Sequence, residues 1–243
     1  MLRIYKKSDY ESMSRQVANL IAAQVTLKPK SVLGLATGST PNGAYKYLIE
    51  SCKQGDLSFA EISTVNLDEY VGLAPDHEQS YRYYMNDNLF NHVDIKLENT
   101  HVPNGLATHP TQECLQYEQL IADLGGVDLQ LLGMGHNGHI AFNEPSESYT
   151  KITNVVDLAE RTIQANSIYF ENDVNKVPKQ AFTMGIGSIM RARKIVIAVS
   201  GAEKAESLVK AFQGPITPSL PASILQVHHD VVLVADEAAL SKF

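Results

Sequence analysis

The chain has 243 residues, of which 44% are hydrophobic and 19% charged, and its formal net charge is −7. This apolar fraction supports a buried core and excludes wholesale disorder, and no apolar run approaches the roughly 20 residues of a membrane-spanning helix. The negative charge disfavours a nucleic-acid partner, which requires a basic face, so a site for an anionic ligand must be made locally positive by helix N-termini and a few cations.

In chain order, short apolar runs typical of buried strands alternate with amphipathic stretches typical of helices. The expected strands are Ser31–Leu35, Ile62–Leu67, Asp128–Leu132, Asn154–Asp157, Ile195–Val199 and Val231–Val234. The expected helices are Asp9–Leu27, Asn42–Gln54, Ser80–Leu89, Thr111–Leu124 and Glu203–Phe212. This alternation predicts an α/β fold of three layers, a doubly wound, mostly parallel sheet with helices on both faces. Ligands of such sheets bind beyond the carboxyl ends of the strands, so we expect the functional residues in the loops there.

The loop after the first expected strand contains Thr37, Gly38, Ser39, Thr40 and Pro41. Gly38 permits a positive φ, and we expect Thr40 to cap a helix whose first position is Pro41. Free backbone N–H groups, three hydroxyls and a helix N-terminus at one point suit a phosphate, although the nucleotide pattern GxxxxGK[ST] is absent. An ordinary strand-to-helix turn is the alternative.

The loop after Ile62–Leu67 places two acids, Asp68 and Glu69, at a strand end. A partly desolvated carboxylate there can abstract a proton next to a carbonyl or iminium carbon. Because the two acids are adjacent, they should point in different directions, and we expect at most one of them to face a site. A surface turn is the alternative.

The segment Gly133–Pro145 is the densest polar cluster of the chain, and its first six residues match GxGxxG. That dinucleotide fingerprint must open a helix, which Pro145 and its neighbours interrupt, so we predict no dinucleotide site. The better interpretation is a glycine-bent loop that projects His139 and Glu144 into a site, where the carboxylate orients an imidazole that moves protons. We interpret six other histidines as structural: His77, His92, His101, His109, His228 and His229.

After Ile195–Val199, Ser200 and Glu203 form a capping-box pattern that predicts the start of a helix. Lys204 then lies near the first turn, where the helix dipole disfavours a cation. This position favours contact with a ligand anion, and a solvated lysine is the alternative. Together these loops supply a phosphate cradle, a carboxylate base and a His–Glu pair, and the sequence shows no metal cage, nucleotide motif or nucleophilic cysteine. This combination suits proton transfers on a phosphorylated small molecule that need no cofactor.

Along nearly its whole length the sequence resembles the glucosamine-6-phosphate deaminase (glucosamine-6-phosphate isomerase) family. The segments that match are Leu33–Pro41, Thr64–Leu73, Ser80–Phe90, Gly133–Pro145, Val177–Gly187 and Gly201–Glu206, and the second and fourth are the most specific. The resemblance implies one deaminase/isomerase domain over residues 1–243. It implies conversion of glucosamine 6-phosphate and water to fructose 6-phosphate and ammonia in amino-sugar catabolism, with no cofactor and no metal.

The resemblance also implies roles. Asp68 matches the acid that moves a proton between C2 and C1 of the open-chain sugar, and His139 matches the residue that drives ring opening, with Glu144 as its partner. Asn137 occupies a position where relatives have Asp or Asn, and since an amide carries no charge, His139 should depend on Glu144 for its cation. The phosphate-binding positions are Gly38, Ser39, Thr40 and Lys204, beside Thr37 of the same loop.

One position departs from the family pattern. Many relatives have an arginine that helps to bind the phosphate where this chain has Ile168, and we hypothesise that the nearby Arg161 replaces it. The chain also stops at Phe243, without the C-terminal extension of allosterically regulated hexameric relatives, which weakens the expectation of activation by an acetylated amino-sugar phosphate.

Three alternatives stay open from the sequence: a galactosamine-6-phosphate deaminase, a 6-phosphogluconolactonase-like hydrolase, and a non-catalytic sugar-phosphate sensor. A lactonase would not need Asp68 as a base, and a sensor could lose Asp68 or His139, both of which are present. Monomer and homo-oligomer are equally open. The N-terminus shows no signal-peptide pattern and Cys52 and Cys114 form no CxxC, so we expect a cytoplasmic protein without membrane association.

Overall fold

The computed structural model describes residues 2–243 and contains a seven-stranded sheet in which every neighbouring pair of strands is parallel. Its central strands are buried along almost their whole length, as a sheet covered on both faces requires. The strand order is β1 (Leu2–Lys7), β10 (Val231–Asp236), β9 (Lys194–Val199), β6 (Leu129–Leu132), β2 (Val32–Leu35), β3 (Ser63–Asn66) and β5 (Thr100–His101).

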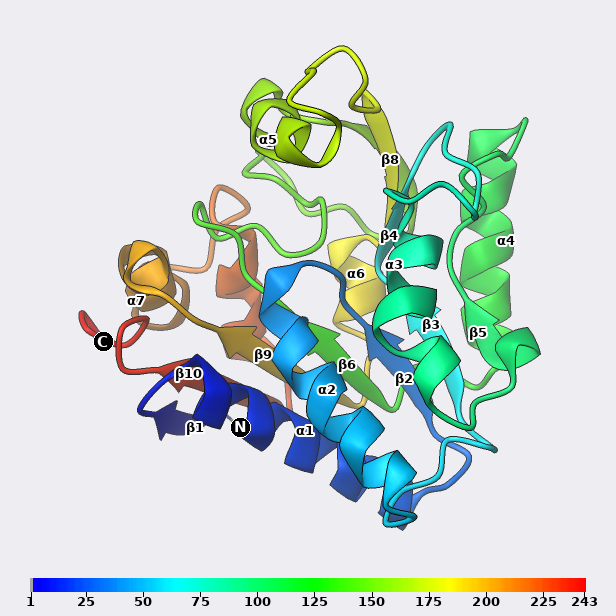
Figure 1. Ribbon diagram of the computed structural model, residues 1–243. Coiled ribbons are helices and arrows are strands. Elements are labelled where there is room, and N and C mark those ends of the chain that lie inside the picture. The colour runs from blue at the N-terminus through cyan, green and yellow to red at the C-terminus, as the bar shows by residue number, and fades with distance from the viewer. Residues whose placement is uncertain (1) are drawn as a thin grey trace.

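Helices cover both faces of this sheet, which confirms the predicted doubly wound α/β fold. The crossovers toward the β5 edge contain α1 (Tyr10–Leu27), α2 (Ser39–Lys53) and α3 (Tyr81–Asn88). Those toward the β1 edge contain α4 (Pro110–Asp123), α6 (Ile186–Ile189) and α7 (Ala205–Gln213). Because such crossovers are right-handed, the two sets lie on opposite faces, and Figure 1 shows α1 and α2 in front of the sheet and α6 behind it.

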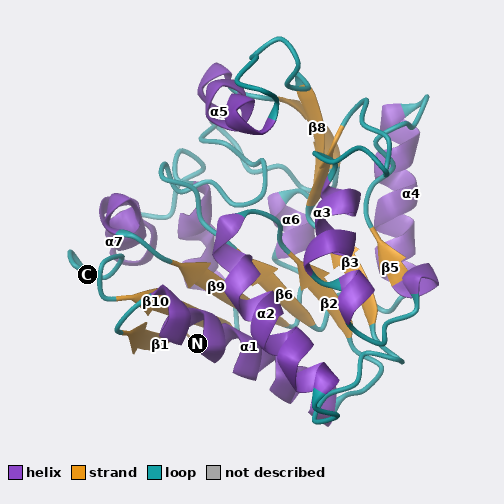
Figure 2. Cartoon of the chain, in the orientation of Figure 1, coloured by secondary structure: helices purple, strands orange, loops and turns teal. Residues whose placement is uncertain are grey.

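The direction of winding reverses between β2 and β6. The chain continues from β2 to β3 on one side, and from β6 to β9 on the other. A crevice therefore opens beyond the carboxyl ends of β2 and β6, at the place where open α/β sheets bind their ligands. Figure 2 shows that loops form most of the region between the main sheet and α5 (Glu160–Asn166).

A second, antiparallel sheet consists of β4 (Asp68–Tyr70), β8 (Gln180–Thr183) and β7 (Asn154–Asp157). A single residue, Leu67, separates β3 of the main sheet from β4, so the chain passes directly from one sheet into the other. The segment Asn154–Asp157 is a strand as expected, but its expected place in the main sheet was wrong. Alternation of residue types predicts that a segment is extended, and it does not say with which strand the segment pairs.

Four strands have no counterpart among the expected elements. In β1 the side chains are mostly exposed and include three cations, as suits an edge strand, so the apolar signal is weak. The others, β4, β5 and β8, have only two to four residues each. The 3-10 helices are η1 (Phe90–His92), η2 (Leu97–Asn99), η3 (Ser167–Tyr169), η4 (Ala202–Lys204) and η5 (Pro221–Val227). No helix within residues 2–243 is long and apolar enough to cross a membrane.

Candidate active site

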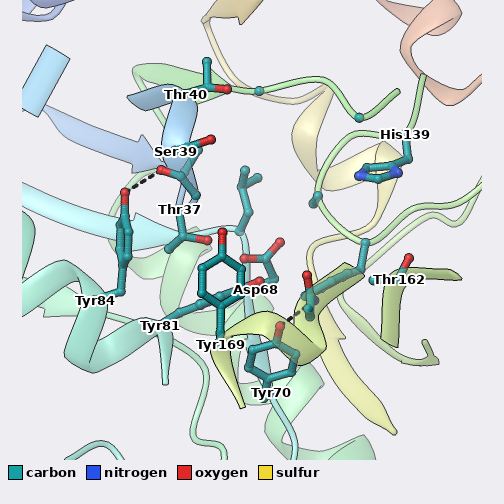
Figure 3. A pocket seen from close by; sticks show the side chains of 18 of the residues that line it. Thr37, Ser39, Thr40, Asp68, Tyr70, Tyr81, Tyr84, His139, Thr162 and Tyr169 are labelled. Atoms are coloured by element: carbon teal, nitrogen blue, oxygen red, sulfur yellow. Dashed lines mark hydrogen bonds between the residues drawn. The ribbon is translucent and has the colours of Figure 1, made fainter. Parts of the chain in front are cut away.

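A cavity of about 520 Å³ opens at the predicted crevice (Figure 3). It brings together the loops that follow β2, β6 and β9, the first and last residues of β4, the start of α3 with the residues before it, and part of the α5–η3 segment. The predicted site residues that line it are Thr37, Gly38, Ser39, Thr40, Asp68, His139 and Lys204. The remaining two, Asn137 and Glu144, contact or approach His139 from outside the lining.

The loop after β2 presents the start of α2 to the cavity. Gly38 is the N-cap residue of α2 and has φ +98°, a conformation that favours glycine. The helix begins at Ser39, so the predicted cap at Thr40 and the predicted first position of Pro41 were wrong: glycine there starts the helix two residues earlier. Since α2 has no side-chain cap, its first N–H groups are available to an anion.

Two cations from different elements line the same cavity, Lys204 after β9 and Arg161 from α5. Neither has a carboxylate within ion-pair distance among residues 2–243. Burial lowers the pKa of Lys204. Burial, followed by the positive charges of Arg161 and Lys204, lowers the pKa of His136, so the three groups share one electrostatic environment. Unneutralised positive charge beside a helix N-terminus suits a phosphate.

The structure corrects the local prediction at Lys204. Ser200 donates its hydroxyl proton to Asp236 rather than capping a helix, so the predicted capping box does not form. Instead, the short helix η4 precedes α7, and Lys204 is the N-cap residue of α7. Ile168 is 61% exposed and does not line the cavity, in contrast to Arg161.

Asp68 is the first residue of β4, where its backbone pairs with Thr183 of β8. Its side chain is only 7% exposed yet reaches the cavity. Burial, with a smaller contribution from the charge of Glu69, raises the pKa of Asp68 to about 8. The neighbouring Glu69 does not line the cavity, because its carboxylate accepts N–H groups at the start of α3. The expected loop at these acids is therefore a short strand.

His139 and Glu144 form a pair at the wall of the cavity. His139 Nδ1 lies 3.2 Å from Glu144 Oε1, within ion-pair distance but outside good hydrogen-bond alignment, so the contact is chiefly electrostatic. Glu144 also accepts hydrogen bonds from Asn137 Nδ2 (2.6 Å) and Thr162 Oγ1 (3.1 Å). Burial alone would raise the pKa of Glu144, but His139, Asn137 and Thr162 together lower it to about 2. A carboxylate that stays ionised can stabilise an imidazolium.

Two glycines shape the loop that carries His139. A Cβ atom on Gly135 would lie 2.2 Å from the His139 ring, so glycine is required there. Gly138 has φ +80°, and its N–H donates to the carbonyl of Gly135 in a tight turn. No helix follows this loop, which therefore lacks the context of a dinucleotide fingerprint.

Several lining residues escaped the sequence analysis. His136 lies inside the GxGxxG pattern, Thr162 lies on α5, and Tyr84 lies on α3, where its hydroxyl donates to the carbonyl of Gly38 at 2.7 Å. Of these three residues, only His136 has a signal in the sequence, which is its position in a polar loop. Within residues 2–243, no group of three or more His, Cys, Asp or Glu side chains could hold a metal ion.

The sequence matches the profile of a family described as glucosamine-6-phosphate isomerases/6-phosphogluconolactonase over residues 6–234. A curated relative, the glucosamine-6-phosphate deaminase of Lachnoclostridium phytofermentans, is 55% identical over 96% of this chain and 98% of its own. A solved structure of a monomeric glucosamine-6-phosphate deaminase is 46% identical, with a TM-score of 0.96, and the match covers 99% of this chain and 100% of the other. The 6-phosphogluconolactonase of Thermotoga maritima shares the fold, with a TM-score of 0.76 and 21% identity. That match covers 97% of this chain and 100% of the other.

We predict that Asp68→Asn raises the melting temperature, and that this gain grows as the pH rises from about 4 to about 8. The ordinary pKa of 3.8 rises to about 8 in the folded protein. In this range the folded state keeps a proton that the unfolded state has released, so the wild type loses stability as the pH rises. Thermal unfolding at several pH values measures the difference. Asp87→Asn, which removes an exposed acid of α3, is the control, and a gain that does not change with pH would contradict the prediction.

Proposed function

This chain belongs to the family of glucosamine-6-phosphate isomerases and 6-phosphogluconolactonases, and we propose that within it the chain acts as a glucosamine-6-phosphate deaminase. The reaction converts glucosamine 6-phosphate and water to fructose 6-phosphate and ammonia. The relatives named as deaminases are 46–55% identical to this chain over nearly its whole length. Three solved 6-phosphogluconolactonases are 18–21% identical to this chain and share the fold.

The observation that carries the proposal is that one cavity combines a desolvated carboxyl group, an imidazole with a carboxylate partner, and a positively charged end. These are the three elements that an aldose–ketose isomerisation of a phosphorylated sugar needs. In Figure 3, Asp68 lies between the loop of Thr37, Ser39 and Thr40 on one side and His139 on the other. A sugar anchored by its phosphate at that loop can extend toward both groups.

The phosphate is held by the N–H groups at the start of α2, by the hydroxyls of its loop, and by Lys204 and Arg161. The helix dipole and the two cations compensate the net negative charge of the chain at this point. Arg161 thereby supplies the positive charge that Ile168 lacks, because Arg161 lines the cavity and Ile168 does not.

Ring opening moves a proton from the anomeric hydroxyl to the ring oxygen, and His139 performs this transfer. It takes the proton as a base and returns it as an acid, so no net proton is consumed. The imidazolium that forms in between is stabilised by Glu144, which is fixed by Asn137 and Thr162. Since Asn137 is uncharged, Glu144 is the only carboxylate that we assign to His139.

Isomerisation follows on the open chain. The carboxylate of Asp68 removes the proton from C2, while the aldehyde oxygen O1 takes up a proton that the substrate ammonium group releases, and an enolamine results. Asp68 then returns its proton to C1, which gives a protonated ketimine at C2. Water then adds to C2 and ammonia leaves, which completes fructose 6-phosphate. Burial raises the pKa of Asp68 to about 8, and a protonated amino group of the substrate beside it favours the carboxylate form.

We propose that this reaction takes place in the cytoplasm, as part of amino-sugar breakdown. Both cysteines are unpaired in the structure, which supports a reducing compartment. The substrate is a small amino-sugar phosphate, and the single domain of residues 1–243 supplies the whole site. A galactosamine-6-phosphate deaminase would use the same chemistry with the other configuration at C4, so the two substrates are compared directly.

Purified protein incubated with glucosamine 6-phosphate and no added cofactor should release ammonia and fructose 6-phosphate in equal amounts. Asp68→Asn should lower kcat by roughly 100- to 10,000-fold, because it removes the base. His139→Gln should slow the reaction by reducing the rate of ring opening. Coupled assays of the two products measure both effects.

Galactosamine 6-phosphate and 6-phosphogluconolactone serve as the comparison substrates in this assay. Turnover of the lactone alone, or unchanged kcat in Asp68→Asn, would contradict the proposed reaction. A rise in melting temperature with glucosamine 6-phosphate but no turnover would favour the sensor alternative.

Arg161→Ala should raise KM for glucosamine 6-phosphate by roughly tenfold or more, since it removes a charge-assisted contact with the phosphate. Ile168→Ala is the matched control on the same segment, and its KM should equal that of the wild type because the side chain lies outside the cavity. Steady-state kinetics and inhibition by inorganic phosphate provide the measurements. An unchanged KM in Arg161→Ala would rule out its role in phosphate binding.

A further inference from the structure

Glu69 is a buried carboxylate that the mechanism does not use, although it is adjacent to Asp68 in the chain. Its side chain is 2% exposed. Oε1 accepts the backbone N–H groups of Tyr70 (2.8 Å) and Tyr81 (2.9 Å), and Oε2 accepts that of Arg82 (2.9 Å). A buried carboxylate with three amide donors is well satisfied and firmly held.

Two of these donors belong to the start of α3, whose free N–H groups are thereby almost fully accounted for. Tyr81 and Arg82, the first two residues of the helix, donate to Glu69, and Tyr83 donates to the side chain of the N-cap residue Ser80 at 3.0 Å. The next N–H group, that of Tyr84, begins the intrahelical ladder to the carbonyl of Ser80. Glu69 thus caps α3 from a strand that lies twelve residues earlier in the sequence.

This cap positions one wall of the cavity. Ser80, Tyr81 and Tyr84 of α3 and its cap line the cavity. The Tyr81 ring stacks on Phe142, with centroids 6.1 Å apart and planes at 7°. The Tyr84 hydroxyl donates to the carbonyl of Gly38, in the loop that we assign to the phosphate. The position of α3 therefore affects both the aromatic contact with Phe142 and this loop.

The charge of Glu69 is balanced by amides rather than by a contacting cation. The Arg82 guanidinium donates instead to Thr100, at 2.7 Å to Oγ1 and 2.7 Å to the carbonyl. The other titratable groups that face the two acids are Tyr70 of β4, Tyr81 of α3 and Tyr117 of α4, all neutral at physiological pH. On the β8 side, the partners Phe182 and Thr183 do not titrate. Burial raises the pKa of Glu69 to about 6, although the three amides and the charge of Arg82 act against this rise. Above that pH, Asp68 faces one negative charge and no contacting positive one among the described residues.

We propose that Glu69 is a positioning residue for the deaminase reaction: it fixes α3 against the strand of Asp68, and its charge sets the pH at which Asp68 becomes a carboxylate. The inference rests on the proposed function for its kinetic consequence. The cap on α3 and the effect of the Glu69 charge on Asp68 do not require a substrate.

Glu69→Gln separates the two roles, because glutamine keeps a carbonyl acceptor for the amides of Tyr70 and Tyr81 while the charge is lost. The acid limb of the pH profile of kcat/KM should move to lower pH by about half a unit or more, since a like charge beside Asp68 is removed. The control Asp87→Asn removes an exposed acid from the same helix and should leave the limb in place. An unmoved limb in an active, folded Glu69→Gln variant would overturn the electrostatic role.

A second measurement needs no activity. The gain in melting temperature from Asp68→Asn is followed against pH in the wild-type background and again in the Glu69→Gln background. The pH at which this gain reaches its plateau should be lower in the Glu69→Gln background. Coincident curves would overturn the proposal, whereas absence of deaminase activity in the wild type would overturn the proposed function alone.

The positioning role has its own readout in amide hydrogen exchange. The N–H groups of Tyr81 and Arg82 should exchange faster in Glu69→Ala, which lacks any acceptor, and Glu69→Gln should restore at least the protection of Tyr81. The matched control is again Asp87→Asn, with protection equal to the wild type. Protection of Tyr81 and Arg82 that is unchanged in Glu69→Ala would show that another group holds α3.

Discussion

The site depends on the passage of the chain from one sheet into another with only Leu67 between them. A strand that left the parallel sheet at its carboxyl end would ordinarily enter a solvated loop, where a carboxyl group keeps its usual acidity. Here β4 follows β3 after one residue and pairs with β8, so Asp68 is fixed in an almost fully buried position. Burial then supplies the raised pKa of about 8 that suits a base working near neutral pH.

The same geometry explains how an acidic chain can take an anionic substrate. The opposite winding of the sheet on the two sides of β2 and β6 brings the starts of α2 and α7 to one cavity, and α5, which lies between β7 and β8 of the second sheet, adds Arg161 to it. Each contributes a positive or partly positive group, and none of the carboxylates of the described chain neutralises Lys204 or Arg161 by contact. The local field therefore differs in sign from the net charge, because short-range arrangement outweighs the distant, screened acids.

Much of the architecture could be predicted from the sequence, and the failures have physical causes. The buried strands β2, β6, β9 and β10 have continuous apolar runs and the longer helices have amphipathic patterns, and the alternation of the two predicts a parallel sheet. The short strands β4 and β8 have none, because their stability comes from pairing with each other rather than from their own pattern. Helix starts were mispredicted at Thr40 and at Ser200, where local capping rules were overridden by Gly38 and by a contact with Asp236. The roles that we propose for Asp68 and His139 come from the family resemblance. The link between Glu69 and α3 is long-range, so no local pattern reveals it.

The neutral side chain of Asn137 has a consequence for how the cavity interacts with salt. When His139 is protonated, its positive charge and the negative charge of Glu144 cancel, so the pair has no net charge. This end of the cavity then acts as a local dipole, whose field decays quickly with distance. The long-range attraction of a dianionic substrate then arises chiefly from Lys204, Arg161 and the start of α2. Ionic strength should consequently affect the encounter between enzyme and substrate, whereas the proton transfers between groups in contact inside the cavity should depend on it much less.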